Sequence, residues 1–328
     1  MNSNHKNGQG LRTSFRHAVY ALSNALDLVG IGDTAHGKRV AIMAAECAET
    51  MRVSADDKAF AFDLGLLHDI GVSTTETHRH LLSKFDWESA QEHCDAGYEL
   101  LHDFQPLAKF ALPIKYHHTR WDVLSTAGLD SETARWANLI YLVDRVDTLA
   151  APHYANGALL MQASEIRAQI AGFATTFFSP ELVDVFLTAS RSEAFWLNLE
   201  PRGILSYLSE MIEYGDAYTA SMDELKQLAF IFSCIVDAKS PFTAEHSSGV
   251  ARVARWLAER LGVSAGNCDK IEIAGLLHDI GKLRIPDEIL DKPAKLDEYE
   301  RKIMNAHSFE TYQILRWIPG FDEIAQWA

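Results

Sequence analysis

The chain has 328 residues, which is enough for two helical domains of ordinary size. It carries 45 acidic and 30 basic residues, a net charge of −15, which argues against a protein that holds duplex nucleic acid by neutralising its phosphates. No apolar run approaches the roughly 18 residues of a membrane span. The polar start, residues 1–12, predicts a disordered tail without an export signal. Four cysteines without a CxxC pair predict free thiols and a cytoplasmic location.

Helical periodicity dominates the rest of the chain. Apolar residues recur at three-and-four spacing, which predicts helices. In chain order these segments are 15–28, 37–51, 89–104, 132–149, 180–187, 222–237 and 249–261. Alternating strand patterns are scarce, so the predicted fold class is all-α.

One string, GLLHDIG, occurs twice, at 65–71 and 275–281. The offset from His68 to His278 is 210 residues, and His36 and His246 are separated by the same 210 residues. We therefore predict two tandem helical domains, at 13–200 and 219–328, joined by a linker at 201–218. Gly71 and Gly281 lie just beyond each His-Asp pair, where a glycine often terminates a helix, so each pair is predicted to end a buried helix.

The first repeat contains five histidines and two aspartates that suit a metal centre. They are His36, His68, Asp69, His93, His117, His118 and Asp144. Imidazole and carboxylate ligands without thiolate suit Fe, Mn, Zn or Ni, and this set is large enough for two divalent ions. Asp69 ends an apolar helix, where an unpaired carboxylate is costly, so it needs a nearby cation, an arginine or backbone amides. Paired metals are well suited to phosphoester hydrolysis.

The order His, His-Asp, His, His-His, Asp resembles the HD superfamily of metal-dependent phosphohydrolases, and more narrowly its HD-GYP branch, which hydrolyses cyclic di-GMP. YHHTRWD at 116–122 is similar to the branch's HHExxDGxGYP region, and LVDRVDTL at 142–149 to its ADxxDAL stretch. The resemblance implies that the seven residues are ligands of two metals. It also implies that Asp69 bridges the metals as a catalytic residue.

The second repeat resembles the same branch over 240–262 and 278–315. The resemblance implies metal ligation by His246, His278, Asp279 and His307, with Asp279 and Lys282 as catalytic residues and Lys282 near the scissile phosphate. Asp27 and Asp237 fall near the position of a third-metal ligand. Four further cations are candidate phosphate contacts or members of solvated helix faces: Lys38, Arg39, Arg120 and Arg145.

Both repeats depart from the pattern. The first has Val72 in place of lysine, Thr119 in place of glutamate and no GYP sequence after Asp122. In the second, the histidine pair is expected a few residues beyond Ala328, so we expect its ligand set to be incomplete.

Three hypotheses remain open. The first is a metal-dependent phosphodiesterase acting on a nucleotide such as cyclic di-GMP. The second is a regulatory module that binds a nucleotide or a protein partner without turnover, and the third is a helical dimerisation scaffold with relic histidines. Homodimer formation is left open, and no membrane or duplex nucleic acid partner is expected.

Overall fold

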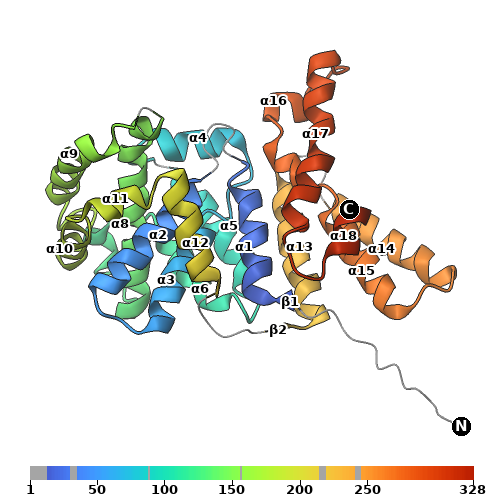
Figure 1. The fold of residues 1–328 in the computed structure, drawn as a ribbon, viewed down its shortest axis with the longest axis horizontal. Coiled ribbons are helices and arrows are strands. Elements are labelled where there is room, and N and C mark those ends of the chain that lie inside the picture. Colours follow the sequence, from blue (N-terminus) through green and yellow to red (C-terminus); the bar gives the residue numbers. More distant parts are fainter. Residues whose placement is uncertain (1–12, 30–34, 88, 156, 214–218, 241–244) are drawn as a thin grey trace, which may run out of the picture. The chain divides into compact units, whose positions relative to one another are not determined.

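The computed structural model describes residues 13–29, 35–87, 89–155, 157–213, 219–240 and 245–328; the predicted tail, 1–12, lies outside them. The fold of these residues is helical, which confirms the predicted all-α class (Figure 1). A minor sheet pairs β1 (Thr13–Ser14) with β2 (Thr219–Ala220) in antiparallel register. Within the described ranges, no helix combines the length and apolar character needed to cross a membrane.

The chain divides into two compact units. The Asp69 unit contains the described residues of 32–72 and 76–215, and the Asp279 unit those of 1–31, 73–75 and 216–328. The helices of the Asp69 unit are α2 (His36–Thr50), α3 (Ala55–Leu67), all but the first residue of α4 (Thr75–Ser83), α5 (Ala90–Leu101), α6 (Ala108–Tyr116), α7 (Trp121–Leu124), α8 (Ser131–Tyr154), α9 (Leu159–Gly172), α10 (Pro180–Ala189), α11 (Glu193–Leu197) and α12 (Pro201–Glu213). Those of the Asp279 unit are α1 (Phe15–Leu26), α13 (Met222–Ala238), α14 (His246–Arg260), α15 (Ala265–Leu277), the 3₁₀ helix η1 (Ile280–Arg284), α16 (Asp287–Leu290), α17 (Glu298–Leu315) and α18 (Asp322–Trp327).

The core of the Asp69 unit is built around α2 and α8. Val40, Ile42 and Met43 of α2 are fully buried, as are Leu139 and Ile140 of α8. Helices α3, α8, α10 and α12 all pack on α2, which runs through the middle of this unit (Figure 1). Residues 39–45 of α2 are all buried, so its middle turns are covered on every side, and its first residue, His36, is carried into the interior.

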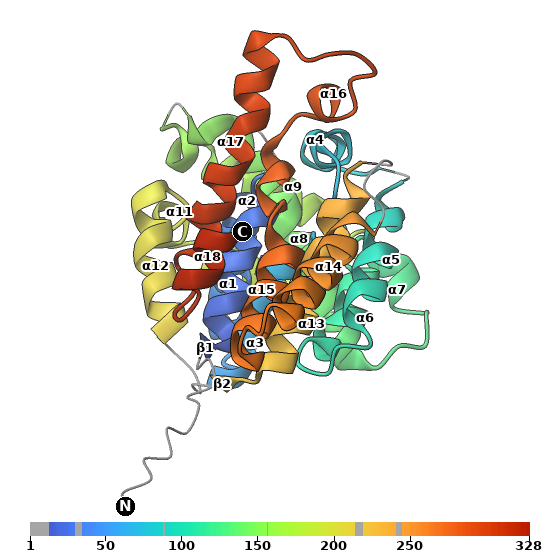
Figure 2. The ribbon, with the colours of Figure 1, turned by 90° about the vertical axis from the view of Figure 1, so that its right-hand side faces the viewer.

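The Asp279 unit has a simpler core. Helices α14 and α15 lie side by side, with α13 packed on both (Figure 2). Ile273 and Leu277 of α15 are buried there, together with Phe232 of α13. This pair, α14 and α15, is the repeat of α2 and α3 in the Asp69 unit.

The units divide the chain differently from the predicted boundaries. Helix α1, expected to open the first domain, belongs to the Asp279 unit, where it packs on α13 and α17. It does so because its buried stripe, including Val19 and Leu22, faces these helices, while β1 pairs with β2. Under the 210-residue offset, α1 and α13 are equivalent, so the two equivalent helices pack together.

The segment predicted as a linker, 201–218, contains a helix. Its first thirteen residues form α12, whose Ile204, Tyr207, Leu208 and Met211 are buried. This three-and-four spacing lets α12 pack on α2, so the segment is part of the Asp69 unit. Residues 214–218 lie outside the described ranges.

The expected role of Gly71 and Gly281 as helix-terminating glycines is wrong, because neither adopts a positive φ. Their small size is what the structure requires. A Cβ on Gly71 would lie 2.0 Å from the carbonyl oxygen of His93, and one on Gly281 would lie 2.0 Å from that of His307. Each glycine therefore lets a later helix, α5 or α17, bring its histidine against the His-Asp pair.

Candidate metal centre

Five helices of the Asp69 unit bring all seven predicted ligands of the first repeat together. His36 begins α2, the pair His68-Asp69 follows α3, His93 lies in α5, the pair His117-His118 follows α6, and Asp144 lies in α8. Six of them form two groups that share Asp69: one with His36 and His68, the other with His93, His117 and His118.

The carboxylate of Asp69 faces both groups. Its Oδ2 lies 3.4 Å from His68 Nε2 and 3.7 Å from His36 Nε2. Its Oδ1 lies 3.3 Å from His93 Nε2 and 3.9 Å from His117 Nε2. A carboxylate whose two oxygens face separate sets of imidazoles has the arrangement of a ligand that bridges two metal ions.

Asp144 also directs one oxygen toward each group of histidines. Its Oδ1 lies 3.4 Å from His36 Nε2, and its Oδ2 lies 3.7 Å from His118 Nε2. The two aspartates therefore face the histidines from α3 and from α8.

The donor atoms fit a metal. His68 Nε2 and Asp69 Oδ1 are buried and make no hydrogen bond within the described part of the chain. Buried polar atoms rarely lack a partner unless an ion or water satisfies them. His68 Nδ1 donates to the carbonyl of Gly65 at 2.8 Å, and His117 Nδ1 to that of Ile114 at 2.7 Å. These bonds leave the Nε2 lone pairs directed at Asp69.

The protonation states differ within the site. Burial, together with the neighbouring histidines, holds the pKa of His117 and that of His118 well below the ordinary range. Burial opposes ionisation of Asp69, but His68 and His93 outweigh it and hold the pKa of this carboxyl well below its usual value. His117 and His118 are therefore in the neutral form that a metal requires. Burial opposes protonation of His36 and His93, but Asp147 beside the first, and Cys94 and Asp69 beside the second, raise the pKa of His36 to about 9 and that of His93 to about 10. A metal must displace a proton from each of these two rings.

Two of the predicted phosphate contacts have structural partners instead. Arg145 is buried, donates to Asp144 Oδ2 at 2.7 Å, and also donates to the carbonyls of Leu81, Lys84 and Phe85. Arg39 is buried and donates to Asp147. Each guanidinium satisfies groups inside the fold, because a buried arginine needs several acceptors.

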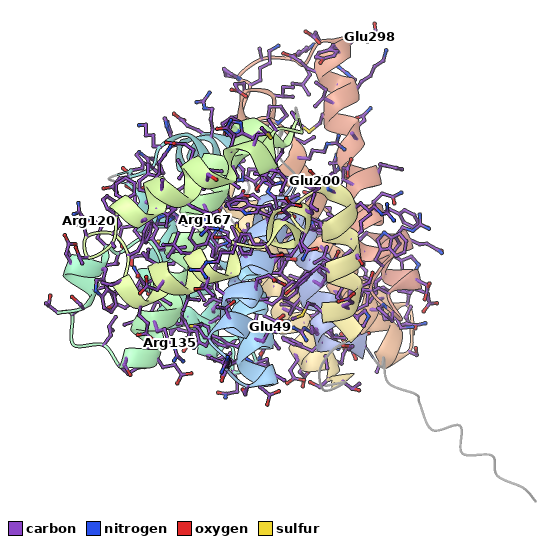
Figure 3. The ribbon with its side chains drawn as sticks, turned by 60° about the vertical axis from the view of Figure 1, so that its left-hand side comes forward. Glu49, Arg120, Arg135, Arg167, Glu200 and Glu298 are labelled. Atoms are coloured by element: carbon purple, nitrogen blue, oxygen red, sulfur yellow. The ribbon has the colours of Figure 1, made fainter. Side chains whose placement is uncertain are left out.

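Arg120 is different, since its side chain is 40% exposed and pairs with Asp122 at 2.9 Å. Its guanidinium lies 4.4 Å from the ring centroid of Phe177. Figure 3 shows Arg120 at the periphery of its unit. Its predicted role as a substrate contact stays a prediction.

Sequence reasoning missed Asp147. This residue lies three positions after Asp144 on α8 and is fully buried. The spacing was an available signal, because residues three apart share a helix face. His36 Nδ1 donates to Asp147 Oδ2 at 2.7 Å.

In the Asp279 unit, the three predicted histidine ligands face the fourth predicted ligand, Asp279. Its Oδ2 lies 3.1 Å from His278 Nε2 and 3.6 Å from His246 Nε2, and its Oδ1 lies 3.7 Å from His307 Nε2. Lys282 Nζ donates to the same Oδ2 at 2.7 Å. This centre is more open, because the side chain of His246 is 43% exposed.

The two predicted third-metal residues do not join these clusters in the described residues. Asp237 accepts hydrogen bonds from the backbone N–H of Ser247 at 3.1 Å and from its hydroxyl at 2.7 Å, so it caps the start of α14. Asp27 follows α1 and is buried in the Asp279 unit.

Comparisons with known proteins agree with this architecture. The HD domain family model matches residues 34–149 and 243–328. A 3′3′-cGAMP-specific phosphodiesterase 1 of Vibrio cholerae is 34% identical over 320 residues, covering 96% of this chain and 74% of that protein. A cyclic di-GMP phosphodiesterase response regulator of Xanthomonas campestris is 44% identical over 114 residues, covering 35% of this chain and 24% of its own.

A solved structure shows a related fold. The crystal structure of a cyclic GMP-AMP specific phosphodiesterase of V. cholerae, V-cGAP3, superposes with a TM-score of 0.70 at 22% identity. The match covers 96% of this chain and 85% of that chain. The likeness therefore extends over both repeats.

Proposed function

Since the chain belongs to the HD domain family, we propose that it is a metal-dependent phosphodiesterase that hydrolyses a cyclic dinucleotide, with its metal centre at Asp69. One observation carries the proposal: the two oxygens of Asp69 face two separate groups of histidines in a nearly closed interior. The relatives' named substrates, 3′3′-cGAMP and cyclic di-GMP, support the substrate class.

The ligand groups divide the work between two ions. His36 and His68 with Asp69 Oδ2 would hold one, and His93, His117 and His118 with Asp69 Oδ1 the other. When bound, such ions supply Lewis-acid stabilisation of the phosphoryl oxygens and activate water. The chain's own contribution is to fix the imidazoles in advance and to exclude bulk water, which strengthens every charge interaction in the centre.

The proposed reaction consumes one water. One P–O ester bond of the cyclic dinucleotide breaks, the water oxygen forms the new bond to phosphorus, and the released ribose oxygen takes up a proton. The product is the linear dinucleotide. The negative charge of the diester needs cations in the site, which the metal ions provide.

The test compares two equivalent substitutions, Asp69→Asn and Asp279→Asn, in the full chain. Bound metal is measured by elemental analysis, and hydrolysis with 3′3′-cGAMP and cyclic di-GMP in the presence of Mn²⁺. We expect Asp69→Asn to lose both metal and hydrolysis. Asp103→Asn, which changes a carboxylate that is 92% exposed and lies beside His102, is the matched control. Full activity of Asp69→Asn would overturn the assignment to this centre.

A second candidate function rests on Val72. This residue occupies the position equivalent to Lys282 and is 2% exposed, so the Asp69 centre has an apolar side chain where the Asp279 centre has a cation. Under this alternative, the Asp69 centre binds metal and a nucleotide as a regulatory module without turnover. Hydrolysis that survives Asp69→Asn but disappears in Asp279→Asn would favour it.

A further inference from the structure

We propose that Asp147 is a positioning residue that fixes the ring of His36 for metal binding; the inference rests on the metal centre proposed above. The ring of His36 is held from both sides. Nδ1 donates to Asp147 Oδ2 at 2.7 Å, while Nε2 lies 3.4 Å from Asp144 Oδ1 and 3.7 Å from Asp69 Oδ2. With the proton on Nδ1, the Nε2 lone pair is directed at the two aspartates. Carboxylate partners of this kind set the tautomer and orientation of a ligating histidine.

Asp147 is itself held rigidly. Arg39 donates from Nε to Oδ1 at 2.6 Å and from Nη2 to Oδ2 at 2.9 Å, a two-point contact that fixes the plane of the carboxylate. The hydroxyl of Tyr154 donates to Oδ1 at 2.6 Å, and the guanidinium of Arg39 lies 4.1 Å from the centroid of that ring. Because Asp147 is fully buried, these donors and His36 hold it without competition from bulk solvent.

The network connects the two core helices that supply metal ligands. Arg39 and His36 belong to α2, whereas Asp147, Asp144 and Tyr154 belong to α8. The bonds to Asp147 therefore fix His36 relative to Asp144 across the contact of the two helices. In the second repeat, the position equivalent to Arg39 is Gly249, which has no side chain to hold a carboxylate, and His246 is far more exposed than His36.

The experiment measures Mn²⁺ binding to the full chain by equilibrium dialysis. We expect Asp147→Ala to lower the Mn²⁺ affinity of the His36 side of the Asp69 centre by about 10-fold to 100-fold. The Mn²⁺ affinity of the side formed by His93, His117 and His118 should stay within about threefold of the wild type. Asp147→Asn keeps an oxygen that accepts the His36 proton, so we expect it to recover most of the lost affinity. Circular dichroism and thermal unfolding monitor the fold of each variant.

Two further variants keep the inference testable if Asp147→Ala does not fold. Arg39→Gln removes the two-point contact and should lower the Mn²⁺ affinity of the same side several-fold. Tyr154→Phe retains the ring against Arg39 and removes one hydrogen bond, so its effect should be smaller. An equal loss of Mn²⁺ affinity at both sides of the Asp69 centre, or no loss at either side, would overturn the positioning role.

The outcomes separate this inference from the proposed activity. Unequal Mn²⁺ loss in a protein that hydrolyses no cyclic dinucleotide would support the role of Asp147 and overturn the proposed function. Hydrolysis by the wild type, with both Mn²⁺ affinities unchanged in Asp147→Ala, would do the reverse. A wild-type chain that takes up no Mn²⁺ would overturn both.

Discussion

The two histidine-aspartate centres share one sequence string but differ in burial. The side chains of His36 and His68 are 4% and 1% exposed, whereas those of their equivalents, His246 and His278, are 43% and 25% exposed. Helix α2 is covered by α8 and α10, while α14 exposes Val253 and other apolar side chains. The repeated string places the His-Asp pair in both units, and the covering helices decide how far the surrounding histidines are removed from solvent.

Metal removal should separate the two centres most strongly. Chelation leaves the Asp69 ligands without the cation that compensates their burial, so the Asp69 unit should lose stability. Metal present at about 1,000 times its dissociation constant adds about 4 kcal/mol to the unfolding free energy, and chelation removes this contribution. Hydrogen exchange of peptides from α3 should accelerate accordingly on chelation, and that of peptides from α15 much less. Equal acceleration in both helices would contradict the greater dependence of the Asp69 unit on metal.

Gly71→Ala should have the next largest effect, since its Cβ would collide with the backbone of α5. We expect a loss of about 3 kcal/mol in unfolding free energy together with weaker metal binding, because His93 must move. Gly281→Ala should cost a similar amount through α17. Urea unfolding measures both variants.

The control for these variants is Gly172→Ala. Among the described residues, no atom lies within 4 Å of a Cβ at this helix end, and the φ of Gly172 is not positive. Its stability should be unchanged or slightly higher, since alanine favours the helix by up to about 1 kcal/mol. A Gly71→Ala protein as stable as Gly172→Ala would contradict the close approach of α5.

The sequence predicted the parts of this molecule that depend on local pattern. Helical periodicity located α2, α8 and α14. The repeat singled out His36, His68 and Asp69, and the family resemblance added the other candidate ligands that the fold brings together. The role of Asp147 was missed because it depends on Arg39, which lies 108 residues away along the chain. The partners of α1 were missed because its apolar stripe does not specify which helix covers it.

Arg145 shows the same limit from the other side. Sequence alone treats an arginine near a predicted ligand as a candidate for phosphate. Its true acceptors are Asp144 and three carbonyls around residues 81–85, more than sixty residues earlier for two of them. Only the tertiary fold reveals that its two Nη groups already have acceptors.

Asp237→Ala tests whether this residue is a cap or a metal ligand. Because its oxygens accept both hydrogen bonds from Ser247 at the start of α14, we expect a loss of about 1 kcal/mol in unfolding free energy. Mn²⁺ content should not change. Ser247→Ala, which removes only the hydroxyl contact, should cost less. Loss of Mn²⁺ from Asp237→Ala at unchanged stability would restore the third-metal hypothesis.

Lys282→Ala should have the smallest effect, and it addresses why the second centre differs from the first. Lys282 Nζ donates to the Asp279 oxygen that His246 and His278 also face, so the ammonium competes with a metal ion for that carboxylate. Removing it should strengthen Mn²⁺ binding at Asp279 by about 1 kcal/mol, or roughly fivefold, in equilibrium dialysis. Lys302→Ala, whose exposed partner is Glu298, is the matched control and should leave the affinity unchanged. If Lys282→Ala instead weakens Mn²⁺ binding, the lysine organises the Asp279 centre, and the difference between the two centres lies in burial alone.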